Sequence, residues 1–307
     1  MYYLSQIDHD FFLPIGGMRS HGYSGKAGSF PWPENVHEVP VEMVKDLPLD
    51  LILYQSKENW LLDQYLILSS HQRSLPRIYL EHDPPRTHPT DAKHPMDDPE
   101  VLLVQVTNFN NLMWDSGNVE TKVIEHGVIV PKDVQYSGEV EKGIVVINNL
   151  FLRGRRLGAD IFEKVKDQVD LDLVGMGSGD FGGLGEIPQA DLAKFESQYR
   201  FFFSPIRWTS LGLAVCEAMM MAMPVVALAT TEMSSVIENG VSGYIDTNIN
   251  TLIDYMKELL DNPFEAKKLG LGAKEVAMER FSIERFSQNW NDAINLVCGN
   301  RKLKVTI

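Results

Sequence analysis

The sequence predicts a mixed α/β fold made of two domains, each built on a parallel sheet. The chain has 307 residues, which is enough for two domains of about 150 residues each. Residues 201–228 have the pattern of a buried strand, a helix and a second strand, the unit from which parallel sheets are made. Short apolar runs bounded by turn-forming residues recur on both sides of a polar linker at residues 131–140.

The composition is that of a globular protein with an acidic surface. Hydrophobic residues make up 44% of the chain and charged residues 23%. The formal net charge of −14 argues against general nucleic-acid binding. No apolar run in the sequence reaches the roughly 18 residues of a membrane span, and the first residues do not resemble a signal peptide. The two cysteines cannot build a disulfide framework, so we expect a cytoplasmic protein with no transmembrane segment.

The clearest signal for a ligand site lies between residues 201 and 223. Its opening aromatic run predicts a buried strand. Thr209 or Ser210 is expected to cap the helix that follows, and Pro224 ends it. The N–H groups of such a helix start, at the carboxyl edge of a parallel sheet, attract anions. Glu217 is a lone carboxylate in an otherwise apolar helix, which calls for a hydrogen-bonding partner unless it is a plain surface glutamate.

Four blocks in the second half of the chain occur in the order and at the spacing of a known family. They are Ser204-Pro205, Leu211-Gly212-Leu213-Ala214-Val215-Cys216-Glu217-Ala218-Met219, Pro224-Val225-Val226-Ala227 and Glu238-Asn239-Gly240-Val241-Ser242-Gly243-Tyr244. Over about residues 120–298 the chain resembles the family 4 retaining glycosyltransferases, whose GT-B fold has two Rossmann-like domains with parallel sheets facing an interdomain cleft. The resemblance implies transfer of a hexose-like sugar from a nucleotide-diphosphate sugar, with no cofactor and no metal.

The resemblance also implies roles for residues around the predicted helix. Glu217 matches the second glutamate of the family's Glu-x7-Glu motif and would bind the ribose hydroxyls of the nucleotide. The first glutamate, which contacts the donor sugar, is replaced by Thr209, which we retain as a candidate catalytic position. The helix start is expected to bind the donor through Ser210, Leu211, Gly212 and Leu213.

Two arginines are the candidate clamp for the donor diphosphate. Arg153 and Arg156 lie in a predicted loop at residues 148–156, just before a helix expected to begin near Gly158. The helix dipole disfavours cations at a helix start, so their presence needs a reason. The resemblance supplies one, because the family binds diphosphate there. The alternative is a solvated basic loop in an acidic protein.

A glycine-rich turn follows the strand predicted at residues 169–174. The resemblance places Gly177 beside the nucleotide and Ile187 in the loop that brackets the base. Taken alone, the Gly-Met-Gly sequence at residues 175–177 also matches the start of a dinucleotide-binding fingerprint. That match is weak because no helix follows directly, so an NAD-dependent dehydrogenase is a distant alternative.

The first half of the chain carries weaker signals. Residues 8–40 are rich in glycine, proline and aromatic residues and predict a long loop, in which Gly17 is the candidate donor-binding glycine. The Asp-His-Asp triplet at residues 8–10 resembles a metal-binding sequence, although chance explains it better. His82 follows the strand predicted at residues 77–80. By resemblance it orients the donor sugar, and it is the candidate catalytic residue of this half.

Histidines and carboxylates are also dense in the segment after His82. Such a set offers ligands for a first-row metal, but prolines interrupt the segment and the spacing matches no known ligand pattern. We therefore predict a stiff, solvated loop. The residues concerned are His88, Asp91, His94, Asp97 and Asp98.

These predictions divide the chain into three parts. Residues 1–135 form an acceptor-side Rossmann-like domain, residues 136–282 the donor-binding domain, and residues 283–307 a terminal helix that crosses back to the first domain and buries Phe286 and Trp290. The predicted partners are a nucleotide-diphosphate sugar and a carbohydrate or lipid-linked acceptor. Two alternatives stay open: a non-catalytic nucleotide-binding module, favoured by the missing glutamate, and a nucleotide-sugar epimerase.

Overall fold

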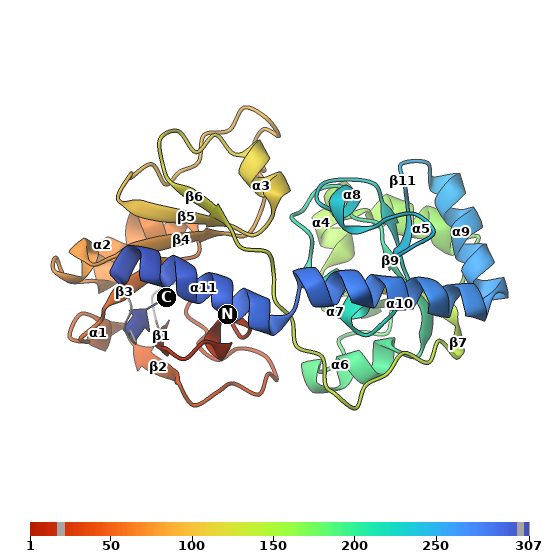
Figure 1. Cartoon of the computed structure of the whole chain (residues 1–307), viewed down its shortest axis with the longest axis horizontal. Helices are drawn as coiled ribbons and strands as arrows, with labels where there is room; N and C mark the ends of the chain where they lie inside the picture. Colours follow the sequence, from red (N-terminus) through yellow and green to blue (C-terminus); the bar gives the residue numbers. More distant parts are fainter. Residues whose placement is uncertain (17–21, 300–303, 307) are drawn as a thin grey trace. The chain divides into compact units, whose positions relative to one another are not determined.

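The computed structural model describes residues 1–16, 22–299 and 304–306. Its contacts divide the chain into two compact units (Figure 1). Unit 1 comprises Met1–Glu125 and Ile283–Ile307, and unit 2 comprises His126–Ser282. The division therefore lies earlier than the position predicted at residue 135, because the linker is bonded to unit 2. The backbone N–H of Val128 donates to Phe281 O at 3.0 Å, and the Tyr136 hydroxyl donates to Arg200 O at 2.7 Å.

Unit 2 is built on a five-stranded parallel sheet in the order β11-β10-β9-β7-β8. The chain starts this sheet in its interior, because β7 is followed by β8 on one side and β9 on the other. The strands are β7 (Val140–Val146), β8 (Leu171–Val174), β9 (Tyr199–Ser204), β10 (Val225–Leu228) and β11 (Gly243–Asp246). The helices are α4 (Leu150–Leu157), α5 (Ala159–Lys166), η4 (Gly179–Phe181), α6 (Gln189–Glu196), α7 (Leu213–Met220), α8 (Met233–Val236), α9 (Ile249–Asp261) and α10 (Pro263–Arg280).

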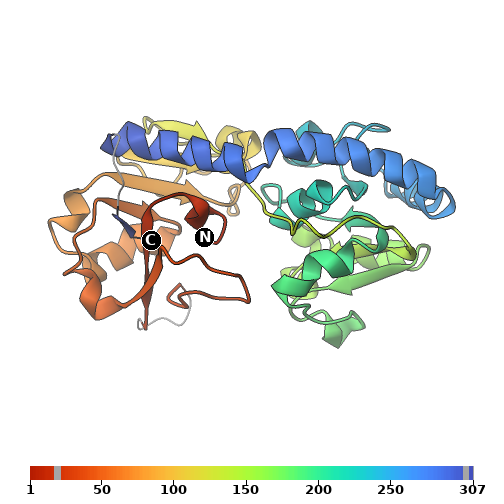
Figure 2. The same ribbon diagram turned by 60° about the horizontal axis from the view of Figure 1, so that its bottom comes forward.

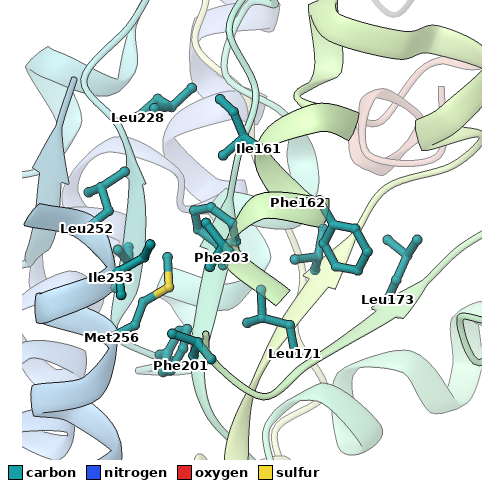
Figure 3. Packing of buried hydrophobic residues seen from close by; sticks show 14 of the residues in the cluster. Ile161, Phe162, Leu171, Leu173, Phe201, Phe203, Leu228, Leu252, Ile253 and Met256 are labelled. Atoms are coloured by element: carbon teal, nitrogen blue, oxygen red, sulfur yellow. The ribbon is translucent and has the colours of Figure 1, made fainter. Parts of the chain in front are cut away.

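The hydrophobic core of unit 2 lies between this sheet and the helices α5 and α9. Phe201 and Phe203 of β9 are fully buried, and Figure 3 shows their rings among side chains of both helices. Apolar side chains on strand and helix face one another here, which removes them from water and contributes the main stabilisation of the unit. The helical side chains in the cluster are Ile161, Phe162, Leu252, Ile253 and Met256.

Unit 1 contains a seven-stranded sheet in the order β2-β1-β12-β3-β4-β5-β6, and its strand pairs are parallel. The strands are β1 (Asp10–Ile15), β2 (Val36–Pro40), β3 (Leu51–Tyr54), β4 (Arg77–Glu81), β5 (Val101–Gln105), β6 (Thr121–Val123) and β12 (Lys304–Thr306). The helices are η1 (Leu4–Gln6), α1 (Val41–Val44), η2 (Asn59–Asp63), α2 (Gln64–Ile67), η3 (Gln72–Ser74), α3 (Asn108–Met113) and α11 (Ile283–Cys298).

The prediction of one long loop at residues 8–40 is wrong, because β1 and β2 both lie in this segment. Pro14 interrupts the apolar run of β1, and a proline within a strand weakens the sequence signal. The partner of β1 on its other side is β12, from the far end of the chain, so local sequence carries little information about this pairing. Gly17 lies outside the described residues.

Residues 59–74 form three short helical pieces and not one continuous helix. A π-helical segment, η2, passes into α2, and Leu68 has extended backbone angles that end the helix. Ser69 and Gln72 then bond reciprocally, since each side-chain oxygen accepts the other residue's backbone N–H at 3.2 and 2.9 Å. This local cap favours the new turn η3 over continuation of the helix.

Helix α11 belongs to unit 1 and contacts η1 there. Figure 2 shows it running along this unit. Phe286 is 8% exposed and Trp290 is 1% exposed, which confirms the buried face predicted from their spacing. None of the described helices has the length and hydrophobicity needed to cross a membrane.

Replacement of Phe203 by alanine is expected to lower the free energy of unfolding by about 3–5 kcal/mol, because it leaves a cavity in the centre of the unit 2 core. Chemical denaturation of the whole chain measures this. Leu152→Ala is the control, since Leu152 is 86% exposed, and it is expected to change the same quantity by less than about 0.5 kcal/mol. Equal effects of the two substitutions would contradict the packing described here.

Candidate functional site

A pocket of about 190 Å³ opens at the carboxyl ends of β7 and β9 in unit 2. Residues 146–148 at the end of β7 and residues 202, 204 and 206 around the end of β9 form two of its sides. Arg153, Thr209 and residues 211–215 form the rest. The chain reverses its direction of strand addition between β7 and β9, and crevices at such a switch point are where parallel α/β sheets bind ligands.

The segment that carries the arginines is a kinked helix, not the loop that we predicted. Gly154 has φ 60° and ψ −143° inside α4, which breaks the helical backbone one residue after Arg153. Gly158 ends the helix with φ 84°. A Cβ atom at Gly158 would collide with the carbonyl oxygen of Pro205. Glycine at this position therefore lets the end of α4 approach the segment that follows β9.

The amino end of α7 lines the same pocket. Its N-cap is Gly212, with φ 95° and no capping side chain, so the prediction that Thr209 or Ser210 caps the helix is wrong. Glycine accepts this positive φ without strain, and the helix therefore begins after Gly212 and not after Thr209 or Ser210. Without a capping side chain, the N–H groups of the first turn are directed to a ligand or solvent. Leu213 is 40% exposed there, consistent with an open helix start.

Arg207 joins the two sides of this pocket. Its guanidinium donates to both carboxylate oxygens of Asp160, at 2.6 and 2.8 Å, and to the carbonyl oxygen of Arg155 at 2.6 Å. The backbone N–H groups of Arg207 and Trp208 both donate to Arg156 O, at 3.0 and 3.2 Å. The hydrogen bond from Arg207 lowers the pKa of Asp160 below its ordinary value. This bidentate geometry fixes the segment before Thr209 against the arginine-bearing helix.

Glu217 lies in α7 beyond the pocket, and its neighbour is a second carboxyl group. Glu196 ends α6, which packs against α7, and is only 1% exposed. Its Oε2 atom has no hydrogen-bond partner among the described residues. Burial, and secondarily the charge of Glu217, raise the pKa of Glu196 well above its ordinary value. Burial therefore favours the neutral form of Glu196 up to a higher pH than in an exposed glutamate.

The glycine-rich turn after β8 is tied to the end of β7. The Met176 N–H donates to the side chain of Asn148 at 2.8 Å, and the Asn149 N–H donates to Met176 O at 2.7 Å. Asn148 lines the pocket, so the side chain of Asn148 lies between the pocket and this turn. Gly177 and the half-buried Ile187 lie in the turn and in the loop that follows, but neither is among the lining residues.

The structure thus brings together some of the predicted site residues and separates others. Arg153, Thr209, Leu211, Gly212 and Leu213 line the unit 2 pocket. The remaining predicted residues of unit 2 are not among its lining residues, and they are Arg156, Gly177, Ile187, Ser210 and Glu217.

His82 lies in unit 1, where it directly follows β4 and lines a separate pocket of about 500 Å³. Its Nε2 atom is 3.1 Å from Oε1 of Gln55, which follows β3. Burial lowers the pKa of His82 below its ordinary value, and the nearby carboxylates of Glu81 and Asp83 offset this only in part. The ring is therefore neutral at pH 7, and its Nε2 donates to the Gln55 oxygen.

The histidine-rich segment after His82 is not solvated throughout, because His94 is buried and hydrogen-bonded. The buried His94 pairs through Nε2 with Glu81 Oε2 at 3.0 Å, and its Nδ1 accepts the Met96 N–H at 3.1 Å. His94 also packs edge-on against the rings of Tyr79 and Trp114. Within the part of the chain that the structure describes, no group of three His, Cys, Asp or Glu side chains is placed to hold a metal ion.

The sequence of unit 2 is similar to known proteins. Residues 158–262 match the family model Glycosyl transferases group 1. A stretch of 100 residues is 30% identical to a poly(ribitol-phosphate) α-N-acetylglucosaminyltransferase of Staphylococcus aureus (strain COL). This stretch is 32% of the present chain and spans only about a fifth, 20%, of that protein.

The structure as a whole resembles solved glycosyltransferases. Anabaena HepE in complex with UDP-glucose matches with a TM-score of 0.63 and 15% identity, over 94% of this chain and 100% of that one. Sucrose-phosphate synthase of Thermosynechococcus elongatus also gives 0.63 at 15% identity, over 80% and 73% of the two chains. Together with the two parallel sheets, these likenesses show the GT-B fold class.

Two residues near the unit 2 pocket were missed at the level of sequence. Arg207 appeared as part of a polar bend, and its bond to Asp160 joins segments 47 residues apart. No role was assigned to Glu196 from the sequence. The one available signal for Glu196 is that it lies three residues before the buried strand that begins at Tyr199.

Substitution of Glu196 by glutamine is expected to stabilise the protein at pH 8 by about 1 kcal/mol or more, and to raise Tm by about 2–4 °C. In the wild type, folding at that pH must protonate a carboxyl group that is ionised in the unfolded chain, so stability falls as pH rises above the ordinary glutamate pKa. The advantage of Glu196→Gln is therefore expected to shrink as pH is lowered toward 4. Thermal unfolding at both pH values measures it. A difference independent of pH would contradict the protonated state.

Proposed function

We propose that this chain is a family 4 type glycosyltransferase that moves a hexose or N-acetylhexosamine from a UDP-sugar to a hydroxyl acceptor. The observation that carries the proposal is the unit 2 pocket. There Arg153 and the amino end of α7 meet at the sheet switch point. No aspartate or glutamate is found among the described lining residues, although the whole chain has a net charge of −14. Such a pocket selects an anionic group.

The diphosphate of the donor is the group that we assign to this pocket. Arg153 supplies a charged donor, and the first-turn N–H groups at residues 212–215 supply neutral donors aimed along the helix dipole. These groups neutralise a leaving diphosphate without a metal ion, so we propose a metal-independent reaction. Arg156, whose backbone is held by the Arg207 segment, is proposed as a second positive charge on the rim.

The uridine nucleotide is suggested by the similar structures. HepE was solved with UDP and with UDP-glucose, and a pneumococcal O-GlcNAc transferase, GtfA, with UDP and GlcNAc. We assign the ribose hydroxyls to Glu217, as the family resemblance implies. The base is assigned to the turn that contains Gly177 and to the loop that ends near Ile187.

The proposed reaction breaks the bond between the anomeric carbon and the diphosphate oxygen, and the nucleotide leaves with the bonding electrons. The acceptor hydroxyl forms its new bond on the face that the diphosphate leaves, which retains the configuration, and its proton passes to the departing phosphate. No carboxylate among the described lining residues offers a nucleophile for a covalent sugar intermediate in this pocket, which favours this route. Thr209 contacts the sugar in this scheme, and the donor-orienting role of His82 remains a prediction from the family resemblance. The cytoplasmic location remains a prediction.

Thr209 also keeps a second function open, because a glutamate is missing where the family resemblance expects one. A non-catalytic module would bind UDP-sugar without turning it over, and an epimerase would change the sugar in the absence of any acceptor. Product analysis with and without acceptor separates both from a transferase.

The variant Arg153→Ala is expected to weaken UDP binding about 10- to 100-fold, since a hydrogen bond to a charged group is worth about 1.5–3 kcal/mol. Glu217→Gln is expected to weaken UDP more than it weakens inorganic pyrophosphate, which has no ribose. Isothermal titration of the whole chain measures both effects. Lys164→Ala is the matched control, because Lys164 is an exposed cation on the neighbouring helix α5. Equal affinities of Arg153→Ala and Lys164→Ala for UDP would refute the assignment.

A further inference from the structure

We propose that the unit 1 pocket is the acceptor site and that it takes a small uncharged glycoside with an apolar aglycone. The inference rests on the proposed function, because only a transferase has an acceptor. It goes further by naming the chemical class of that acceptor, which the pocket's volume, lining and charge define within unit 1.

The pocket occupies a ligand-binding position in its own sheet. Pro14 comes from the end of β1, residues 52–56 from the end of β3 and the turn after it, and His82 from the turn after β4. These are carboxyl ends of parallel strands, and β2 and β3 lie on opposite sides of β1 in the sheet order, which makes this a switch point. Its volume of about 500 Å³ is within the range that holds a drug-sized ligand.

One side of the pocket is a connected row of polar side chains. His82 Nε2 lies 3.1 Å from Gln55 Oε1, and the Gln55 N–H donates to Asn59 Oδ1 at 3.3 Å. The Asn59 Nδ2 group donates to Asp63 Oδ2 at 3.1 Å. The Nδ1 atom of His82 makes no hydrogen bond to any residue that the structure describes. Amide, carboxylate and neutral imidazole groups bind sugar hydroxyls, because each hydroxyl is both a donor and an acceptor.

The backbone around Asn59 and Asp63 supports a binding role. Both residues belong to η2, a π-helical segment that passes directly into α2. Gln64, the first residue after η2, donates its side-chain amide to the carbonyl oxygen of Trp60. The Oε1 atom of Gln64 accepts the Tyr54 hydroxyl at 3.0 Å. Single π-turns are less stable than α-helix and are found frequently at functional sites. Here the π-turn presents Asn59 and Asp63 to one pocket.

The other side of the pocket is apolar. Ile52, Leu53 and Leu68 are buried, Ile67 is half-buried, and all four line the cavity with Pro14. A fully hydroxylated ligand would leave this wall facing polar groups that it cannot pair. An aryl or alkyl aglycone instead removes the wall from water, at about 25 cal/mol per Å² of apolar surface.

The charges of the described lining residues disfavour an anionic acceptor. Its described lining contains two carboxylates, Glu58 and Asp63, and neither lysine nor arginine. The net charge of the whole chain, −14, has the same sign. A phosphate-bearing polymer would therefore meet like charge both at long range and at the site, whereas an uncharged glycoside meets none.

The test is direct binding to the full chain, measured by saturation-transfer NMR. The probes are p-nitrophenyl β-D-glucopyranoside and octyl β-D-glucopyranoside, with poly(ribitol phosphate) as the anionic comparison. Ile67→Trp fills the pocket and is expected to weaken binding of the glycosides at least tenfold. Leu66→Trp is the matched control, since the adjacent Leu66 is 70% exposed and does not line the pocket, and it is expected to bind the glycosides like the wild type.

Titration of UDP into the wild type, Ile67→Trp and Leu66→Trp tests the site in unit 2 separately. The three proteins are expected to bind UDP with the same affinity. Lack of UDP binding counts against the proposed function. The acceptor assignment is overturned by any of three results: no glycoside binds, the glycosides bind Ile67→Trp as tightly as Leu66→Trp, or poly(ribitol phosphate) binds and the glycosides do not.

Discussion

The site in unit 2 depends on one electrostatic constraint: an arginine and the unpaired N–H groups of a helix face the same small pocket. Arg153 and the start of α7 are about 60 residues apart in the chain, and each alone has a plain explanation as a surface cation or a helix terminus. Together, in a pocket with no carboxylate among its described lining residues, they concentrate positive potential in an otherwise acidic protein. That is the condition for holding a leaving diphosphate.

The surrounding fold maintains this arrangement through short-range geometry. Strand order places the ends of β7 and β9 side by side. Gly158 permits close approach of the Pro205 carbonyl, and Arg207 fixes the following bend to Asp160 and to the backbone of α4. Burial of Glu196, whose charge would face that of Glu217, favours its neutral form. The contacts of Gly158 and Arg207 fix the positions of the segments around the pocket, and the burial of Glu196 affects the charge beside α7.

Local pattern was sufficient for much of unit 2. The strands β9 and β10 and the helix between them were predicted because their apolar runs are uninterrupted and end at prolines or polar turns. Features that depend on distant partners were not predictable in this way. The strand β1 contains a proline and pairs with β12 from the other end of the chain. The N-cap at Gly212 depends on a positive φ angle, whereas Thr209 and Ser210 are residue types that commonly cap helices and so were predicted instead. The raised pKa of Glu196 arises from burial and the nearby Glu217, both of which depend on tertiary structure.

The most direct measurement of the central claim is hydrogen–deuterium exchange of the whole chain with and without UDP. If the diphosphate is bound between Arg153 and the start of α7, the backbone amides at residues 211–215 and those around residues 153–158 exchange more slowly when UDP is present, because the ligand accepts or shields their hydrogen bonds. The turn at residues 175–177 is expected to follow. Unchanged exchange in the first two segments at saturating UDP, or protection confined to unit 1, would contradict the account.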